Sequence, residues 1–200
     1  MRLILGDSYV NMTQENIKND DPLAVYKQMN GVDMFMGITF NNIRVSFYAF
    51  MAGLLLSVGT ILLLLYNGIM LGTFHHLFYT QDLLFKSLSI VWIHGTLEIS
   101  SIIIAGAAGL ILGNSILFPK TYSRRQSFLI SAKDGVKIII GLIPLFIVAG
   151  FLESFVTRFT QMPIFINLTI ILSSLLFIIW YVIIYPLKLS RREKNESTEN

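Results

Sequence analysis

The sequence predicts an all-α polytopic membrane helical bundle, with about four transmembrane helices and one interfacial or re-entrant half-helix. Three observations predict this class. Hydrophobic residues make up 54% of the chain and charged residues only 14%, the mean hydropathy is +0.67, and the apolar residues gather in long runs. This composition is typical of membrane proteins rather than of soluble domains.

Four apolar segments are long enough to cross a membrane: residues about 45–66, 89–117, 136–157 and 164–187. A helix that rises about 1.5 Å per residue needs about 20 residues to cross the hydrocarbon layer. The second segment exceeds one crossing, so we expect its first turns, near Trp92, at the interface. Pro144 predicts a kink in the third segment because proline removes one backbone hydrogen bond.

The segments outside these spans are more polar. Residues 1–40 mix charged and apolar groups, which predicts short amphipathic helices at the membrane surface or in the cytosol, with a turn at Asp20-Asp21-Pro22. Residues 67–79 are apolar but too short to span, and two glycines interrupt them, which predicts the half-helix. The chain thus divides into an N-terminal region (1–40), a transmembrane domain (41–187) and a tail (188–200) that is basic and then disordered.

Basic residues assign an orientation to the predicted spans. Lys and Arg gather in the N-terminal region, in the 118–137 loop and in the tail, whereas only Lys86 and Arg158 fall on the other side. With four crossings, the positive-inside rule predicts a multi-pass protein of the cytoplasmic (inner) membrane with both termini cytoplasmic.

This orientation places five polar residues at one outer level of the membrane: Asn67, His94, Glu98, Glu153 and Arg158. His94 and Glu98 lie four residues apart and therefore share one helix face. Ionisable groups inside a membrane are costly, and they either fix helix register or form a functional site. Two interpretations stay open: a structural polar cluster, or a site for an ion or a partner.

Small residues recur at every fourth position on the first two spans. On the second span they share the face of His94 and Glu98, which predicts that these two side chains point into the bundle. Such stripes let helix backbones approach closely in lipid, and we expect them to mediate helix packing and oligomerisation. The residues are Ala49, Gly53 and Ser57 on the first span and Ser101, Ala105, Gly109 and Gly113 on the second.

Catalytic, metal and cofactor sites are not expected. The chain has no cysteine, which excludes thiolate chemistry and disulfides. His94 and Glu98 have the spacing of two metal ligands, and His75-His76 lies at a similar depth, but no HExxH or comparable set is present. Nucleophile elbows, paired intramembrane aspartates and phosphate-binding loops are also missing. An intramembrane metal-dependent hydrolase remains a remote alternative.

Several motifs in order resemble the stage II sporulation protein M family of integral membrane proteins, over about residues 35–187. They are Asn41-Asn42, Tyr66-Asn67-Gly68, His94-Gly95-Thr96-Leu97-Glu98, Gly106 to Gly109 with Gly113, and Phe151-Leu152-Glu153. The resemblance implies shared polar positions at Asn67, Gly68, His94, Gly95, Glu98 and Glu153. The segments 5–10 and 21–27 resemble an internal part of longer members, so we expect a shortened form.

The resemblance implies a protein without known enzymatic activity. The namesake acts in a membrane complex with peptidoglycan-degrading partners during engulfment of the forespore. We therefore expect a non-enzymatic scaffold of an envelope complex whose partners are membrane lipids, further copies of the chain, and envelope proteins such as cell-wall hydrolases, but no nucleic acid. The alternative is a transporter or channel with a proton or cation site at His94, Glu98 and Glu153.

Overall fold

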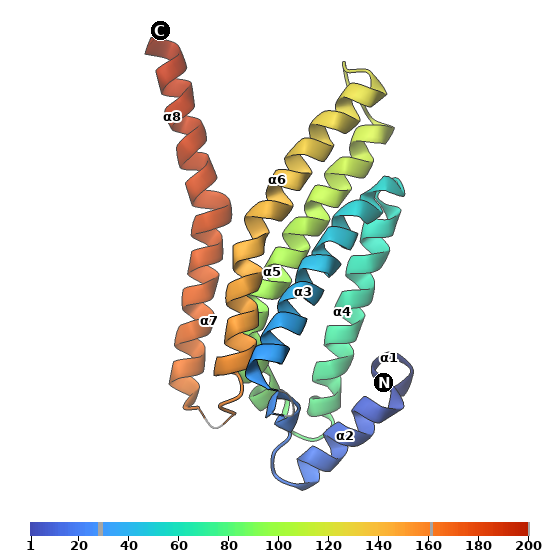
Figure 1. Ribbon diagram of the computed structural model, residues 1–200, viewed down its shortest axis with the longest axis vertical. Helices are drawn as coiled ribbons and strands as arrows, with labels where there is room; N and C mark the ends of the chain where they lie inside the picture. The colour runs from blue at the N-terminus through green and yellow to red at the C-terminus, as the bar shows by residue number, and fades with distance from the viewer. Residues whose placement is uncertain (28–29, 161, 200) are drawn as a thin grey trace.

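The computed structural model describes residues 1–27, 30–160 and 162–199, which form helices and no strand. The long helices run side by side in alternating directions, and the short N-terminal helices lie across one end of the bundle (Figure 1). In chain order the elements are α1 (Arg2–Leu5), α2 (Asp7–Lys18), η1 (Ala24–Lys27), α3 (Gly31–Met51), η2 (Ala52–Leu54), α4 (Val58–Tyr79), α5 (Leu84–Leu117), α6 (Arg124–Phe151), η3 (Leu152–Val156), α7 (Ile164–Ile179), η4 (Trp180–Ile184) and α8 (Tyr185–Glu199).

The predicted class is confirmed, because 4 helices are long and apolar enough to cross a membrane. They are Val58–Tyr79, Leu84–Leu117, Arg124–Val156 and Ile164–Arg192. The last three coincide closely with the predicted second, third and fourth spans. The protein is therefore a multi-pass membrane protein.

The predicted first span, residues 45–66, is wrong. The chain turns back in the middle of this apolar run, at Leu56 and Ser57, whose φ angles are 53° and 70°. These left-handed conformations are uncommon for residues other than glycine. Two hydrogen bonds support the turn: the Ser57 hydroxyl donates to the Leu110 carbonyl (3.0 Å), and the Thr60 hydroxyl donates to the Ala49 carbonyl (2.7 Å). The run is thus a helical hairpin.

The predicted half-helix, residues 67–79, is wrong for the same reason. These residues complete α4, which runs from the turn back to the end of the bundle where α2 lies (Figure 1). Gly68 and Gly72 have open space around them and do not interrupt the helix. Once the turn lies at Ser57, the residues that were too few to span alone belong to a 22-residue helix.

The hairpin changes the position of the chain ends. Because α3 adds one more antiparallel helix to the bundle, the N-terminus and the C-terminal helix α8 lie at opposite ends of the bundle (Figure 1). The four predicted crossings were expected to bring both termini to one side of the membrane, whereas the chain ends lie at opposite ends of the bundle. The expected domain boundary at residue 40 falls inside α3.

Helix α5 is the centre of the bundle and packs against α3, α4, α6 and α7. Its buried side chains include Leu97, Ala105 and Leu112, which pack with Phe50 of α3 and Phe146 of α6. A second apolar cluster lies under η1 and the end of α4, around Leu23 and Phe78. On α5, His94 lies between Ile90 of the second cluster and Leu97 of the first.

The small-residue stripes meet each other inside the chain. A Cβ built at Gly53 would overlap the backbone of Gly109, and a Cβ at Gly113 would overlap Ser57. Ala49, Ser101 and Ala105 are fully buried along the same contact. The faces expected to mediate oligomerisation are therefore occupied by the contact between the α3–α4 hairpin and α5.

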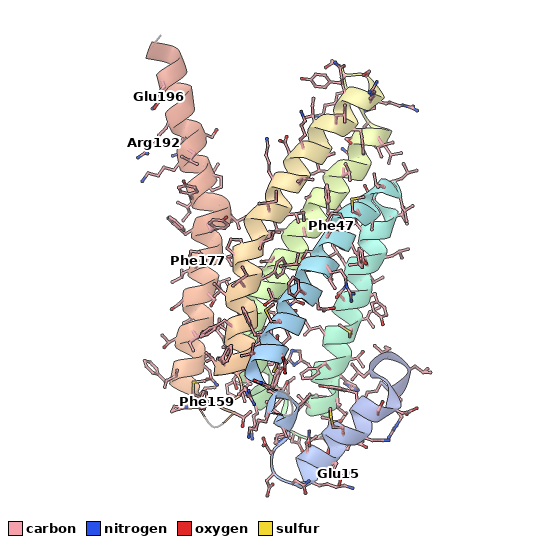
Figure 2. The ribbon with its side chains drawn as sticks, viewed as in Figure 1. Glu15, Phe47, Phe159, Phe177, Arg192 and Glu196 are labelled. Atoms are coloured by element: carbon pink, nitrogen blue, oxygen red, sulfur yellow. The ribbon has the colours of Figure 1, made fainter. Side chains whose placement is uncertain are left out.

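Helices α7, η4 and α8 form one rod along the side of the bundle, with Phe177 midway and Arg192 and Glu196 near its far end (Figure 2). The Tyr181 hydroxyl donates to the Gly141 carbonyl of α6 (3.1 Å), which ties the rod to the bundle. The prediction of a disordered tail is wrong up to Glu199, and residue 200 lies outside the described residues. Leu, Lys, Arg and Glu are good helix formers, and α8 simply continues the rod.

Substitution of Gly109 tests the close helix contact. A Cβ at Gly109 would meet the Thr60 hydroxyl at 2.7 Å and the Ala49 carbonyl at 2.5 Å. We expect Gly109→Ala to lower the free energy of unfolding by about 1–3 kcal/mol, as overpacking of a tight interior does. Gly72→Ala is the matched control, because nothing lies within 4 Å of its Cβ. Equal stability of both variants in denaturant titrations would contradict the contact.

Cysteine accessibility tests the position of the termini. The chain has no cysteine, so single cysteines report one position each. Ser8 and Ser190 are both exposed, at opposite ends of the bundle. We expect a membrane-impermeant maleimide to label Ser8→Cys and Ser190→Cys from opposite sides of sealed vesicles. Labelling of both from the same side would contradict the fold.

Candidate functional site

Three ionisable side chains converge near the end of the bundle that α2 covers. His94 and Glu98 come from adjacent turns of α5, and Glu153 comes from η3, the π-helical turn that ends the α6 span. One ligand atom from each lies within 4.8 Å of the others, and His94 Nε2 is 3.7 Å from Glu153 Oε2. The side chain of His94 is only 6% exposed and that of Glu153 16%. The site is therefore compact and largely closed to solvent and lipid.

Thr157 fixes the orientation of the His94 ring. The Thr157 hydroxyl donates to the Leu152 carbonyl (3.1 Å), so toward His94 its oxygen can only accept. His94 Nδ1 lies 3.2 Å from this oxygen and donates its proton to it. In the neutral ring the lone pair then lies on Nε2, which faces Glu153. Thr157 thus directs a free nitrogen lone pair into the cluster.

Helix α3 adds a polar face to the cluster. Asn42 faces Glu98 with its side-chain amide, and its Nδ2 is buried without a hydrogen-bond partner of good geometry. Thr39 and Ser46, one turn before and after on the same face, are buried and likewise lack partners. Buried polar groups are normally paired, so this face is suited to hold something polar against α5 and α6.

Tyrosines from the N-terminal region cover the cluster. The rings of Tyr26 in η1 and His94 meet in an edge-to-face arrangement, with centroids 6.0 Å apart. Burial raises the pKa of Tyr26 well above 10, and the nearby Glu153 carboxylate adds to the effect. Burial also raises the pKa of Tyr9 to about 12. Both phenols therefore stay neutral at physiological pH, and they cover the cluster without adding charge to it.

Two cavities border the cluster from different sides. One, of about 230 Å³, lies between α4 and α5 and is lined by Asn67, Gly68 and Glu98. The other, of about 350 Å³, lies between η1 and α3 and is lined by Tyr26, Asp33 and Glu153. Asn67, expected at the same depth as Glu98, is therefore close to the cluster, although its amide donates to the Leu63 carbonyl (2.9 Å).

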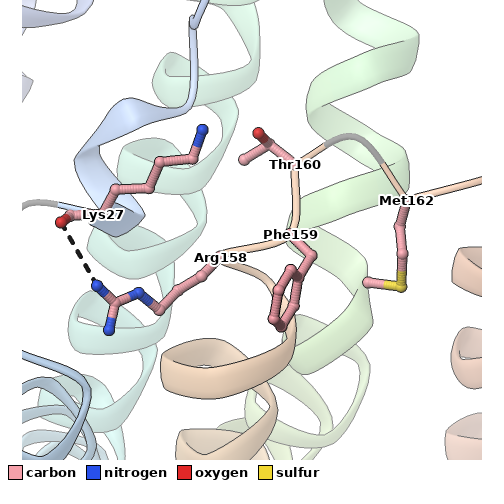
Figure 3. A pocket seen from close by; sticks show the side chains of 5 residues that line it. All are labelled: Lys27, Arg158, Phe159, Thr160 and Met162. Carbon is pink, nitrogen blue, oxygen red and sulfur yellow. Dashed lines mark hydrogen bonds between the residues drawn. The ribbon is translucent and has the colours of Figure 1, made fainter.

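Arg158, grouped with the cluster by depth, belongs to a separate pocket at the end of the bundle. Figure 3 shows its guanidinium directed toward the Lys27 carbonyl, at 3.5 Å, with Phe159, Thr160 and Met162 around the same cavity of about 630 Å³. No ion pair joins Arg158 to Glu153 among the described residues. His75 also lies outside the cluster, and its Nδ1 forms a hydrogen bond with the Ser87 hydroxyl (2.7 Å).

Three contributors to the site were not predicted from the sequence. Asn42 belongs to the Asn41-Asn42 motif of the family resemblance, and its spacing from Thr39 and Ser46 on an apolar helix marks a polar inner face. Tyr26 and Thr157 carried no sequence signal, because only the folded chain brings them against His94. The small residues Ser101, Ala105, Gly109 and Gly113 lie on the buried face of α5, as His94 does.

Fold and site together define a polytopic helical membrane protein with a buried His–Glu–Glu cluster at one end of its bundle. The chain belongs to the stage II sporulation protein M family, whose family model matches residues 4–158. The match begins before the expected residue 35 and ends before α7, and it includes all three cluster residues. This family is not a known enzyme family. No curated protein and no solved structure matches the chain.

Proposed function

We propose that the chain is a non-enzymatic membrane scaffold of an envelope complex, and that it binds a partner helix within the membrane. Family membership supports an envelope setting, and peptidoglycan remodelling of the kind that accompanies engulfment is the process that the resemblance implies. One observation carries the proposal: a groove on the outer face of α3 and α6 that contains an arginine.

The groove has a volume of about 510 Å³ and lies between two helices at membrane depth. Its walls are apolar side chains of both helices, and Phe47 marks its α3 side in Figure 2. The lining residues are Phe40, Ile43, Arg44, Phe47, Phe50, Val136, Ile139, Ile140 and Ile143. An apolar groove between two helices accommodates a third helix by the same side-chain packing that joins the first two.

Arg44 specifies the chemistry of the partner. Its guanidinium is exposed on the lipid side of α3 and makes only a long hydrogen bond to Asn41 Oδ1 (3.4 Å). No acidic side chain among the described residues forms an ion pair with it. A charge at membrane depth is costly unless it is paired, so a partner helix with a carboxylate at this level would be stabilised. We therefore propose an acidic membrane helix as the occupant.

The distribution of basic residues supports an orientation for the scaffold. The turn between α5 and α6, the start of α6 and helix α8 carry most of the Lys and Arg residues, including Arg124, Arg125, Lys188 and Arg191. By the positive-inside rule we propose that this end faces the cytoplasm, which puts the N-terminus and the cluster on the outer side. The membrane would be the cytoplasmic one.

Proton or cation transport is the second candidate, and the two cavities beside Glu98 and Glu153 favour it. Both cavities lie in the half of the bundle that holds the cluster. In the other half, backbone atoms of Gly53 and Gly109 are in contact, and the core is apolar. This close packing favours a scaffold over a conducting protein.

Photocrosslinking in cells tests the groove. A photoreactive residue at Ile140, which lines the groove, is expected to crosslink one discrete membrane protein. Leu176 on α7 is the matched control, because it is 66% exposed and lies away from the groove. Arg44→Gln is expected to reduce the Ile140 product at least about tenfold, since bonds between charged groups contribute about 1.5–3 kcal/mol. Arg125→Gln should leave it unchanged. Products with lipid alone, or equal yields at both positions, would contradict the proposal.

Flux measurements decide between the two candidates. In vesicles that contain the purified chain and a pH- or cation-sensitive dye, we expect no flux above that of empty vesicles. A flux that Glu98→Gln abolishes and Glu15→Gln does not would favour transport and count against the scaffold. Glu15 is the control because it is exposed on α2, outside the cluster.

A further inference from the structure

We propose that His94, Glu98 and Glu153 bind one divalent metal ion, through His94 Nε2 and one oxygen from each carboxylate. This site is independent of the scaffold proposal, because it lies inside the bundle and not in the α3–α6 groove. The proposal rests on four properties of the cluster: the spacing of its donors, the orientation of His94, the buried amide of Asn42 that faces Glu98, and the balance of charge.

The donor spacing fits a shared ion. Bonds of about 2.0–2.2 Å from zinc to nitrogen or oxygen place two ligands of the same ion about 3–4 Å apart. His94 Nε2 and Glu153 Oε2 are 3.7 Å apart, too far for a hydrogen bond but suitable for two ligands of one ion. All three donors lie within 4.8 Å of one another, so only small side-chain rotations are needed to complete the set.

Thr157 provides the outer contact that a histidine ligand requires. A metal-bound imidazole usually donates its second N–H to an acceptor, which fixes the ring and its tautomer. Thr157 Oγ1 accepts from His94 Nδ1 because its own proton goes to the Leu152 carbonyl. The π-helical turn η3 contains Glu153, and its Leu152 carbonyl accepts the hydrogen bond from Thr157. Such π-helical turns often occur at functional sites. Thr157 is a positioning residue in this arrangement.

Asn42 points independently to a ligand. Asn42 is buried, with 4% of the residue exposed, and its Nδ2 faces Glu98 without a hydrogen bond of good geometry. A buried donor without a partner is costly, and a carboxylate held by a metal, or a water bound to that metal, would accept from it. The Thr39 hydroxyl, one turn earlier on the same face of α3, is also buried without a hydrogen-bond partner and gives this face a second polar group.

Charge balance favours an ion over an ion pair. Two ionised carboxylates and a neutral imidazole place two negative charges in a closed, largely apolar site, which is strongly unfavourable. The described residues offer no cation to neutralise both, since Arg158 is directed toward Lys27. One divalent ion brings the net charge of the cluster to zero. The cavity lined by Glu153 and Asp33 is a route by which an ion could enter.

The donor set indicates the kind of ion. One imidazole and two carboxylates are suited to zinc and to manganese, whereas calcium prefers oxygen ligands alone. With three protein ligands, at least one coordination position remains for water. The site therefore resembles an open metal centre in its ligand number.

Metal titration of the purified full chain tests the proposal. We expect the chelator-treated protein in mild detergent to bind one equivalent of Zn²⁺ or Mn²⁺ in isothermal titration, with an increase in Tm. His94→Gln, Glu98→Gln and Glu153→Gln should each weaken binding at least about 100-fold. Thr157→Val should weaken it about 10–100-fold, the usual effect of losing an outer-sphere contact, and Thr157→Ser should restore it. X-ray absorption should show one imidazole among oxygen donors.

Matched controls separate the cluster from surface binding. His76→Gln and Glu15→Gln remove an exposed histidine and an exposed carboxylate and should leave the affinity unchanged. Circular dichroism and the Tm of each metal-free variant establish that it is folded. The proposal would be overturned if the folded wild type bound no equivalent of either ion, if binding survived in folded Glu153→Gln, or if His76→Gln abolished it.

Discussion

The close contact between the α3–α4 hairpin and α5 determines the rest of the structure. At Gly53, Gly109 and Gly113 no side chain separates the backbones of the hairpin and α5. This close approach allows the Ser57 hydroxyl to donate to the Leu110 carbonyl of α5, while the Thr60 hydroxyl donates to the Ala49 carbonyl within the hairpin. Because the turn is fixed at this position along α5, α3 packs along α5 with Asn42 beside Glu98 and with Thr39 against Gly150 of α6. The polar cluster is thus assembled by a packing contact several helical turns away.

The cluster shows how the bundle accommodates ionisable groups at membrane depth. His94 and Glu98 lie on the inner face of the most buried helix, and Glu153 reaches them from a π-helical turn at the end of the α6 span. The N-terminal region then closes the site with Tyr26 and an apolar cluster around Leu23. The region that appeared peripheral in the sequence is therefore part of the enclosure, in agreement with a family match that begins at residue 4.

The class of the protein could be predicted from the sequence because composition and run length report directly on the lipid environment. The inward orientation of His94 and Glu98 was also predictable, since it follows from helix periodicity and the small residues on the same face. The turn at Leu56 and Ser57 was not predictable, because neither residue favours positive φ and the stabilising contacts come from α5. The same missing long-range information hid Tyr26 and Thr157 and led to the wrong position of the first span.

A distance between two spin labels tests the hairpin most directly. Phe40 and Ile69 are both exposed, one on α3 and one on α4, and the chain has no native cysteine to remove. In a continuous helix the step of 29 positions from Phe40 to Ile69 would separate the two labels by about 40 Å along the axis, at about 1.5 Å per residue. The hairpin places them on antiparallel neighbours, and it predicts a label distance below about 25 Å in electron paramagnetic resonance. A distance near 40 Å would contradict the hairpin and, with it, the assembly of the cluster.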